Sequence, residues 1–124
     1  MKVSEVIEIV LNSNGGKKFD NTCDQLIEGN MNYPVTGVAT TFMATADVIR
    51  KAIDMKCNLI ITHEPTYFTG ADRLDWLQND EVYHAKKRLI NDNKISIWRY
   101  HDHMHAGTTD QIYTGLLETM GWLE

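Results

Sequence analysis

The sequence predicts an α/β fold: a mostly parallel sheet with flanking helices, in α-β-α-β-α-β-α order. Segments with apolar residues at helical spacing alternate along the chain with short runs of β-branched and apolar residues. One run, residues 58–62, contains the continuous apolar triplet Leu59-Ile60-Ile61, which is typical of a strand covered on both faces. Such alternation favours right-handed crossovers between parallel strands. The 124 residues, of which 43% are hydrophobic, fit a single domain over residues 1–124.

The N-terminal third supplies a helix and then a strand. Ser4 is a suitable N-cap for a helix over residues 4–12, and Asn14-Gly15-Gly16 ends this helix. Residues 17–32 have no clear period. Residues 35–42 are rich in β-branched side chains, which predicts the first strand.

The middle of the chain continues the alternation. Thr45 is expected to cap a helix that runs to Met55, and the strand at residues 58–62 follows it. Residues 65–79 are predicted to form a loop with a short helical piece near residues 74–77. The aromatic residues of this loop either line a pocket or pack over the sheet: Tyr67, Phe68 and Trp76.

Two helices and one strand complete the predicted fold. Asp80 opens a helix that ends at Asn91-Asp92-Asn93, and residues 95–100 form the last strand. Thr108 or Thr109 then caps a final helix that runs through Met120.

The net charge and the cysteine spacing argue against nucleic-acid binding and against a disulfide-bonded or metal-binding CxxC motif. The formal net charge is −5, and no basic patch stands out, so the chain is not expected to bind nucleic acid. The basic run Lys86-Lys87-Arg88 is predicted to be a solvated helix face. Cys23 and Cys57 have no CxxC spacing, and no apolar run approaches the length of a membrane span. These features predict a cytoplasmic protein with reduced thiols and no membrane partner.

Histidines follow two of the predicted strands. His63-Glu64 comes directly after the strand at residues 58–62, and His101 comes directly after the last strand. Ligands of open α/β sheets bind beyond the carboxyl ends of the strands, so both segments are expected at one site. His84 lies within a predicted helix and is expected to be a surface residue.

His101, His103 and His105 occur at alternate positions. If the strand continues past Tyr100, their imidazoles project to one side, as divalent-metal ligands or as the polar tail of a strand. Asp102 then points away from them, either fixing an imidazole tautomer or facing solvent. Asp110 is expected to compensate the dipole of the last helix.

Several of these motifs resemble those of one family. Residues 59–65 (LIITHEP) resemble the "IITHHP" stretch of the NGG-one-interacting-factor-three-like family, also described as dinuclear-metal-centre hexameric or type 2 GTP cyclohydrolase-like proteins. Residues 45–53 look like its preceding helix. Residues 101–107 (HDHMHAG) stand where that family has "HTNLDAA", and residues 109–112 are similar to its following "VND-L" helix start.

The resemblance implies a metal site with two exchanged ligand types. Glu64 replaces the second histidine of the family's pair, and His105 replaces its aspartate, so the numbers of imidazoles and carboxylates are preserved. The implied metal ligands are His63, Glu64 and His105, for one or two ions of zinc, iron or manganese. The implied catalytic role of His101 is proton transfer or support of the ligands.

The resemblance also implies that this chain corresponds to the N-terminal half of longer family members, whose C-terminal half supplies a further His and Glu. By resemblance we expect a homo-oligomer, a hexamer, that acts as a metal-dependent hydrolase on a small molecule of unknown identity. The alternative is a metal-binding or assembly module without catalysis. A third possibility is a mononuclear hydrolase whose metal is bound by His101, His103 and His105, as in amidohydrolase-like sites. It ranks last, because the α/β pattern around these histidines is too short for a full barrel.

Overall fold

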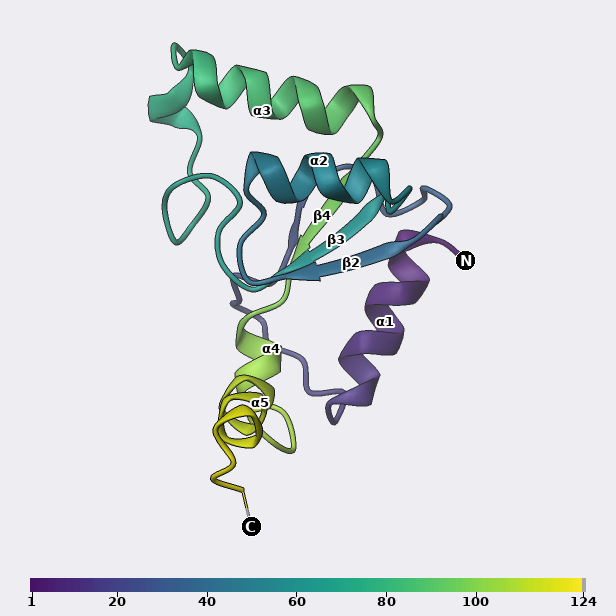
Figure 1. The fold of residues 1–124 in the computed structure, drawn as a ribbon, viewed down its shortest axis with the longest axis vertical. Coiled ribbons are helices and arrows are strands. Elements are labelled where there is room, and N and C mark those ends of the chain that lie inside the picture. The colour runs from purple at the N-terminus through teal and green to yellow at the C-terminus, as the bar shows by residue number, and fades with distance from the viewer. Residues whose placement is uncertain (124) are drawn as a thin grey trace.

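The computed structural model describes residues 1–123 and contains one four-stranded sheet (Figure 1). Its strands are β1 (Leu26–Glu28), β2 (Val38–Thr41), β3 (Leu59–Thr62) and β4 (Ser96–Arg99). They lie in the order β1-β4-β3-β2. The last three run parallel, whereas β1 pairs antiparallel with β4. The predicted α/β class with a mostly parallel sheet and flanking helices is therefore confirmed. The predicted α-β-α-β-α-β-α order is wrong, because β1 comes before β2 without a helix between them and a short helix at residues 102–105 precedes the last helix.

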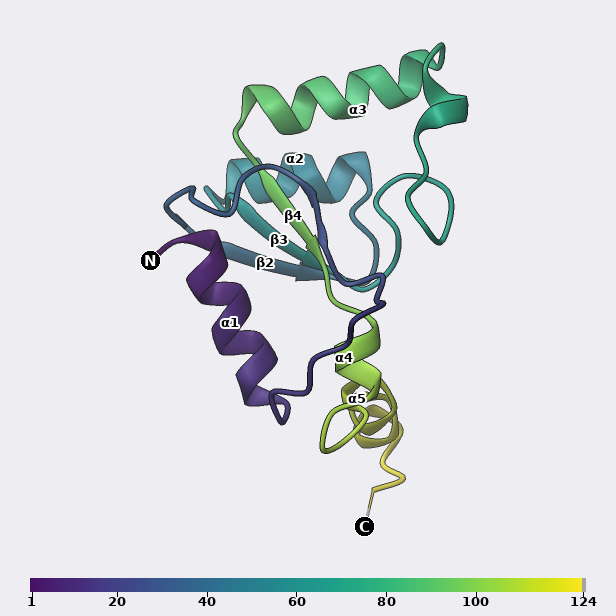
Figure 2. The same ribbon diagram turned by 180° about the vertical axis from the view of Figure 1, so that it is seen from behind.

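Helices cover both faces of the sheet. They are α1 (Val3–Ser13), α2 (Ala46–Asp54), α3 (Glu81–Asp92), α4 (Asp102–His105) and α5 (Gln111–Met120), with a 3₁₀ turn η1 (Asp75–Leu77). Figures 1 and 2 show α2 and α3 on one face and α1 on the other, with α4 and α5 beyond the carboxyl end of β4. None of the helices in residues 1–123 combines the length and the hydropathy that a membrane span needs.

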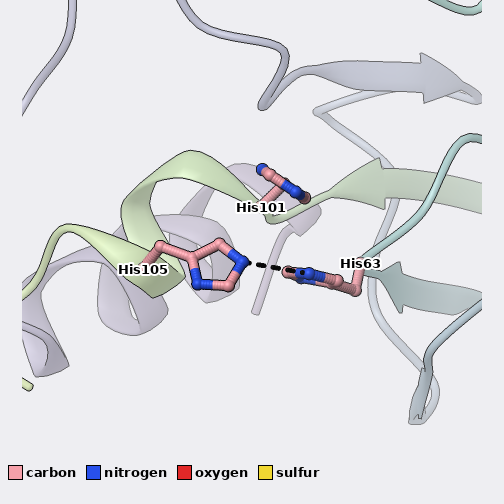
Figure 3. A group of neighbouring side chains, drawn as sticks. All are labelled: His63, His101 and His105. Atoms are coloured by element: carbon pink, nitrogen blue, oxygen red, sulfur yellow. Dashed lines mark hydrogen bonds between the residues drawn. The ribbon is translucent and has the colours of Figure 1, made fainter. Parts of the chain in front are cut away.

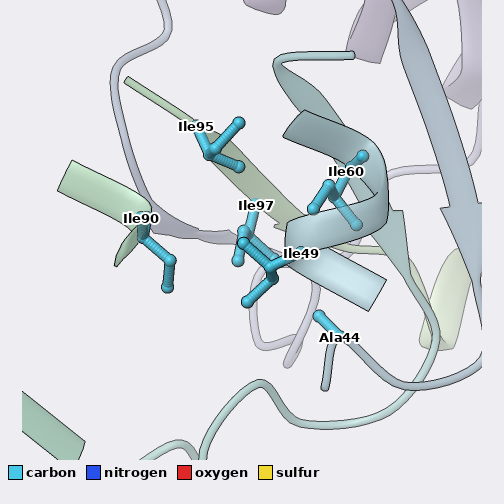
Figure 4. Close-up of a cluster of buried hydrophobic side chains, with 7 residues drawn as sticks. Ala44, Ile49, Ile60, Ile90, Ile95 and Ile97 are labelled. Atoms are coloured by element: carbon cyan, nitrogen blue, oxygen red, sulfur yellow. The ribbon is translucent and has the colours of Figure 1, made fainter. Parts of the chain in front are cut away.

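The alternating side chains of the central strands divide the core into two clusters. Ile60 and Ile97 point toward α2 and α3, where they pack with Ile49 and Ile90 (Figure 4). Leu59 and Ile61 belong to the cluster on the α1 side. All four residues of β3 are buried, which explains why this strand appears in the sequence as a continuous apolar run.

Two of the predicted helix caps are correct and two are wrong. The Thr45 side chain accepts a hydrogen bond from the Val48 N–H at 3.2 Å, and Asp80 accepts one from the Tyr83 N–H at 2.6 Å. The first helix instead has Lys2 at its N-cap, and the Lys2 N–H donates to Glu5. Asp110, rather than Thr108 or Thr109, caps the last helix, because its carboxylate accepts from the N–H groups of two residues in the first turn.

Strand β1 lies in the segment for which no element was predicted. It is only three residues long and pairs with β4 in an irregular register. The following residue, Gly29, has φ +95°, and a Cβ atom there would lie 2.5 Å from Ser96 Cα. Only glycine allows this close approach of backbones, and so short an edge strand leaves little periodicity in the sequence.

The last strand does not continue past Tyr100, so the condition for three histidines on one side of a strand is not met. Strand β4 ends at Arg99, and the chain then turns into α4. The Asp24 carboxylate causes this turn, because it accepts hydrogen bonds from the backbone N–H groups of His101, Asp102 and His103 at 2.7, 2.8 and 2.9 Å. The three alternate histidines therefore do not share one side of a strand. The hypothesis of a mononuclear site on His101, His103 and His105 loses its structural support.

The basic run on α3 is less solvated than predicted. Lys86 is half-buried, and its ammonium donates to the Thr66 carbonyl. Lys87 lies 3.4 Å from the Glu28 carboxylate. Both side chains thus connect α3 to neighbouring segments.

Candidate metal centre

Three imidazoles meet beyond the carboxyl ends of β3 and β4 (Figure 3). His63 directly follows β3, His101 precedes α4, and His105 is the last residue of α4. One possible ligand atom from each lies within 4.8 Å of the others. The structure thus brings together the two histidine-bearing segments that follow the strands.

Helical spacing explains which histidines converge. Positions i and i+4 share a helix face, so the turn of α4 places His101 and His105 on the same side. His103 points elsewhere: its Nδ1 lies 2.6 Å from Asp24 Oδ2, and its ring packs edge-on against Phe19 with centroids 4.8 Å apart.

Hydrogen bonds fix the His63 ring. Its Nδ1 lies 3.2 Å from the Tyr100 carbonyl oxygen, and a carbonyl can only accept, so Nδ1 carries the proton. Nε2 is then left with a free lone pair. His63 is 5% exposed, and burial lowers its pKa, which favours neutral imidazole. Neutral imidazole is the form that binds metal ions.

His105 presents its Nε2 in the same way. Its Nδ1 lies 2.7 Å from Asp110 Oδ2, so a carboxylate orients this ring. Burial alone would raise the pKa of Asp110, but the hydrogen bonds from His105 and the α5 backbone lower it. Asp110 therefore both caps α5 and holds His105.

The spacing of these two nitrogens fits a metal ion. His63 Nε2 and His105 Nε2 are 3.3 Å apart. Two imidazoles bound to one tetrahedral zinc at about 2.0–2.1 Å have nitrogens about 3.3–3.4 Å apart. The pair thus has the donor type and the separation that a transition metal requires.

His101 has a different relation to the pair. Its ring stacks on that of His63, with centroids 4.4 Å apart and planes at 24°, and lies edge-on to that of His105, with centroids 4.9 Å apart. Its Nδ1 lies 2.9 Å from Asp102 Oδ1. Burial alone would raise the pKa of Asp102, but hydrogen bonds from His101, Thr22 and Cys23 hold it well below its usual range. The carboxylate thus fixes His101 while its own side chain remains 37% exposed.

A second group of donors shares His101. One ligand atom each from Cys23, His101 and Asp102 lie within 4.8 Å of one another. Burial raises the pKa of the Cys23 thiol to about 11. The two donor groups, one with His63 and His105 and one with Cys23 and Asp102, share the imidazole of His101. This arrangement is compatible with one metal ion or with two.

Glu64, expected to be a ligand, lies outside both donor groups among the described residues. Its backbone N–H donates to the Phe42 carbonyl at 2.8 Å, which fixes the chain direction after β3. His84 also lies apart, on α3, with its Nε2 2.8 Å from the Gln78 carbonyl oxygen.

Two residues that shape the site were not found from the sequence. Asp24, whose side chain is 1% exposed, and Cys23 both lie in the segment without a predicted element. No local pattern connects them to residues almost 80 positions later, because their hydrogen bonds are purely tertiary.

Curated relatives agree with the resemblance. A protein of Staphylococcus epidermidis named GTP cyclohydrolase 1 type 2 homolog is 31% identical over 107 residues, which are 84% of this chain and 28% of that protein. A protein of the same name from Clostridium acetobutylicum is 29% identical over 104 residues, 84% of this chain and 37% of that protein. The chain thus spans about a third of the length of these relatives.

Solved structures share the fold. A Bacillus cereus protein related to NIF3 superposes with a TM-score of 0.77 at 25% identity, over 98% of this chain and 32% of that one. Reduced HcgD from Methanocaldococcus jannaschii gives a TM-score of 0.71 at 20% identity, over 92% of this chain and 46% of that one. The family profile described as Duf34/NIF3 (NGG1p interacting factor 3) matches residues 1–120. The resemblance is confirmed, and the chain belongs to the Duf34/NIF3 family.

Proposed function

We propose that this chain binds a divalent transition metal ion between His63 and His105, for use in a hydrolase-type reaction on a small molecule. The observation that carries the metal site is the 3.3 Å separation of the two Nε2 atoms. The Nδ1 of each ring faces an acceptor, the Tyr100 carbonyl or the Asp110 carboxylate. Such partners orient imidazole ligands and raise their basicity.

The residues around the pair suit acid–base chemistry. His63 and His105 would hold the divalent ion, which would supply Lewis acidity for a hydrolytic reaction. His101 stacks on His63 and is oriented by Asp102, so its Nε2 is available to take up or release a proton. The names of the curated relatives support a hydrolase class but leave the substrate of this chain open.

A second candidate is a metal-binding or assembly module without catalysis. Catalytic zinc sites usually have three protein ligands and one open position. Here the Nε2 atoms of His63 and His105 lie at ligand spacing, whereas the ring of His101 stacks on that of His63 and Glu64 lies outside the group. Metal binding without turnover would favour this second candidate.

Metal content of protein purified without a histidine tag tests the site. After incubation with zinc, iron or manganese and removal of free metal, elemental analysis is expected to find near-stoichiometric metal in the wild type. His63→Ala and His105→Ala are expected to lose it, because each removes half of the donor pair. His84→Ala is the matched control and retains the metal, since His84 lies outside both donor groups. Equal metal in all four proteins, or none in the wild type, would contradict the proposal.

The same samples test the role of His101. His101→Ala is expected to keep its metal but to lose hydrolysis of GTP, the compound in the names of the curated relatives, by the loaded protein. Loss of the metal as well would make His101 a ligand rather than a proton-transfer group. Absence of hydrolysis by the loaded wild type would favour the module.

We also propose, from the family resemblance, a homo-oligomer and specifically a hexamer. Exposed apolar side chains at the C-terminal end support an interface there: Tyr113, Leu116, Met120, Trp122 and Leu123. Light scattering on the eluting protein is expected to give a mass several times that of one chain, and a monomer at micromolar concentration would refute this expectation.

A further inference from the structure

Helix α5 has little packing against the rest of the protein. None of residues 111–120, all within the described part of the chain, is buried. Neither core cluster of the described residues includes a residue of this helix. Figures 1 and 2 show α5 beyond the carboxyl end of β4, away from α2 and α3. The hydrophobic core therefore contributes little to the position of α5.

The chain before α5 is held firmly as far as Gly107. The Asn14 amide donates to the carbonyl oxygens of His103 and Met104 at 3.1 and 3.3 Å. Gly107 approaches the same amide so closely that a Cβ atom there would lie 2.1 Å from it. These contacts fix the end of α4 and the residues that follow it. They stop short of α5, which begins at Gln111.

Asp110 connects α5 to the candidate metal centre. Its Oδ1 accepts hydrogen bonds from the N–H groups of Ile112 and Tyr113, both at 3.1 Å, which caps the helix. Its Oδ2 lies 2.7 Å from His105 Nδ1. The Nε2 of the same ring is 3.3 Å from His63 Nε2. One carboxylate thus joins the first turn of α5 to an imidazole of the donor pair.

Metal binding would strengthen this connection. An imidazole that binds an ion through Nε2 is polarised, so its Nδ1–H becomes a better donor to a carboxylate. The helix itself has only 10 residues, and isolated helices shorter than about 12–15 residues are marginal in water. The helical state of α5 therefore depends on its docking, for which Asp110 supplies the polar contact with the metal pair.

From these contacts we propose that metal binding at His63 and His105 stabilises the docked, helical state of α5 through the Asp110 carboxylate. The inference rests on the proposed metal function and adds a regulation to it. Coupling between two events is reciprocal, so docking of α5 raises the metal affinity by the same factor. The exposed apolar side chains of α5 are thus held in one position for more of the time in the metal-bound protein.

Hydrogen–deuterium exchange followed by mass spectrometry tests the coupling in the wild type with and without zinc. Amide exchange in residues 111–120 is expected to slow about tenfold when zinc is bound, because opening of α5 becomes less frequent. Exchange in α3 is expected to stay the same, since α3 contributes no residue to the donor pair. His63→Ala lacks half of this pair, so zinc is expected to leave its α5 exchange unchanged.

Asp110→Ser separates the helix cap from the contact with His105. Serine caps helices about as well as aspartate, but its single side-chain oxygen cannot serve both the first turn and the imidazole. The variant is expected to lose most of the slowing by zinc, and its zinc Kd is expected to rise about tenfold. Because the coupling is reciprocal, the two factors are expected to agree.

Asp80→Ser is the matched control variant. Asp80 caps α3 in the same way, through the Tyr83 N–H, and lies outside the metal pair. The same substitution there is expected to leave both the zinc Kd and the slowing of α5 exchange as in the wild type. A loss of both in Asp80→Ser would show that weakening any helix cap is sufficient, which would overturn the coupling through Asp110.

Elemental analysis of the same samples separates two kinds of failure. A wild type that holds zinc but shows unchanged exchange in α5 would overturn the coupling and leave the proposed metal site intact. Equal slowing in Asp110→Ser would also overturn it, because the effect would then not pass through the carboxylate. Absence of zinc from the wild type would overturn both the metal site and this inference.

Discussion

Replacement of Ile97 by alanine is expected to lower the free energy of unfolding by about 2–5 kcal/mol. Ile97 is fully buried on β4, between β1 and β3, and packs in the cluster beneath α2 and α3. Truncation removes apolar surface and leaves a cavity that a three-layer arrangement cannot close without moving the sheet or a helix. Urea unfolding followed by circular dichroism measures the change.

Ile9→Ala is the matched control for this prediction. Ile9 lies on α1 and is 54% exposed, so the same truncation is expected to change the unfolding free energy by no more than about 0.5 kcal/mol. If both variants lost equal stability, the cluster around Ile97 would not be the main core of the sheet.

Zinc at a free concentration one hundred times its Kd is expected to raise the free energy of unfolding by about 2.7 kcal/mol. The reason is linkage: the 3.3 Å separation of the two Nε2 atoms exists only when β3, α4 and α5 are in place. An ion that binds this pair therefore stabilises the folded state alone. The same urea experiment with and without zinc measures the effect.

The variants of the metal-content experiment identify the source of this stabilisation. His63→Ala is expected to unfold at the same urea concentration with and without zinc, whereas His84→Ala is expected to respond like the wild type. Stabilisation of His63→Ala by the full amount would show that zinc binds elsewhere. Destabilisation of the wild type would show preferential binding to the unfolded chain.

The elements that could be predicted are those whose sequence pattern arises from burial of the element itself or from contacts within one helical turn. The apolar triplet of β3 marks a strand buried on both faces, and Thr45 and Asp80 begin their helices through hydrogen bonds within one turn. Strand β1 escaped prediction because it is an edge strand whose pairing depends on the approach of Gly29 to Ser96.

The candidate metal centre likewise has a part that the sequence predicts and a part that it does not. His63 and the histidines after β4 were predicted to meet because parallel strands end at one edge of a sheet. The selection of His101 and His105 over His103 was not predictable, because it depends on the helical turn of α4. That turn is held by Asp24, which is distant in the sequence and has no motif of its own.

The hydrogen bonds between Asp24 and the start of α4 also bear on the order of folding. They connect positions 77 to 79 residues apart, so a long segment must close before the turn is stabilised. Contacts of such high sequence separation form slowly. The crossovers through α2 and α3 join nearer neighbours and are expected to form first. We therefore expect the parallel strands β2, β3 and β4 to pair before the three imidazoles converge, so that metal uptake follows the formation of this part of the sheet.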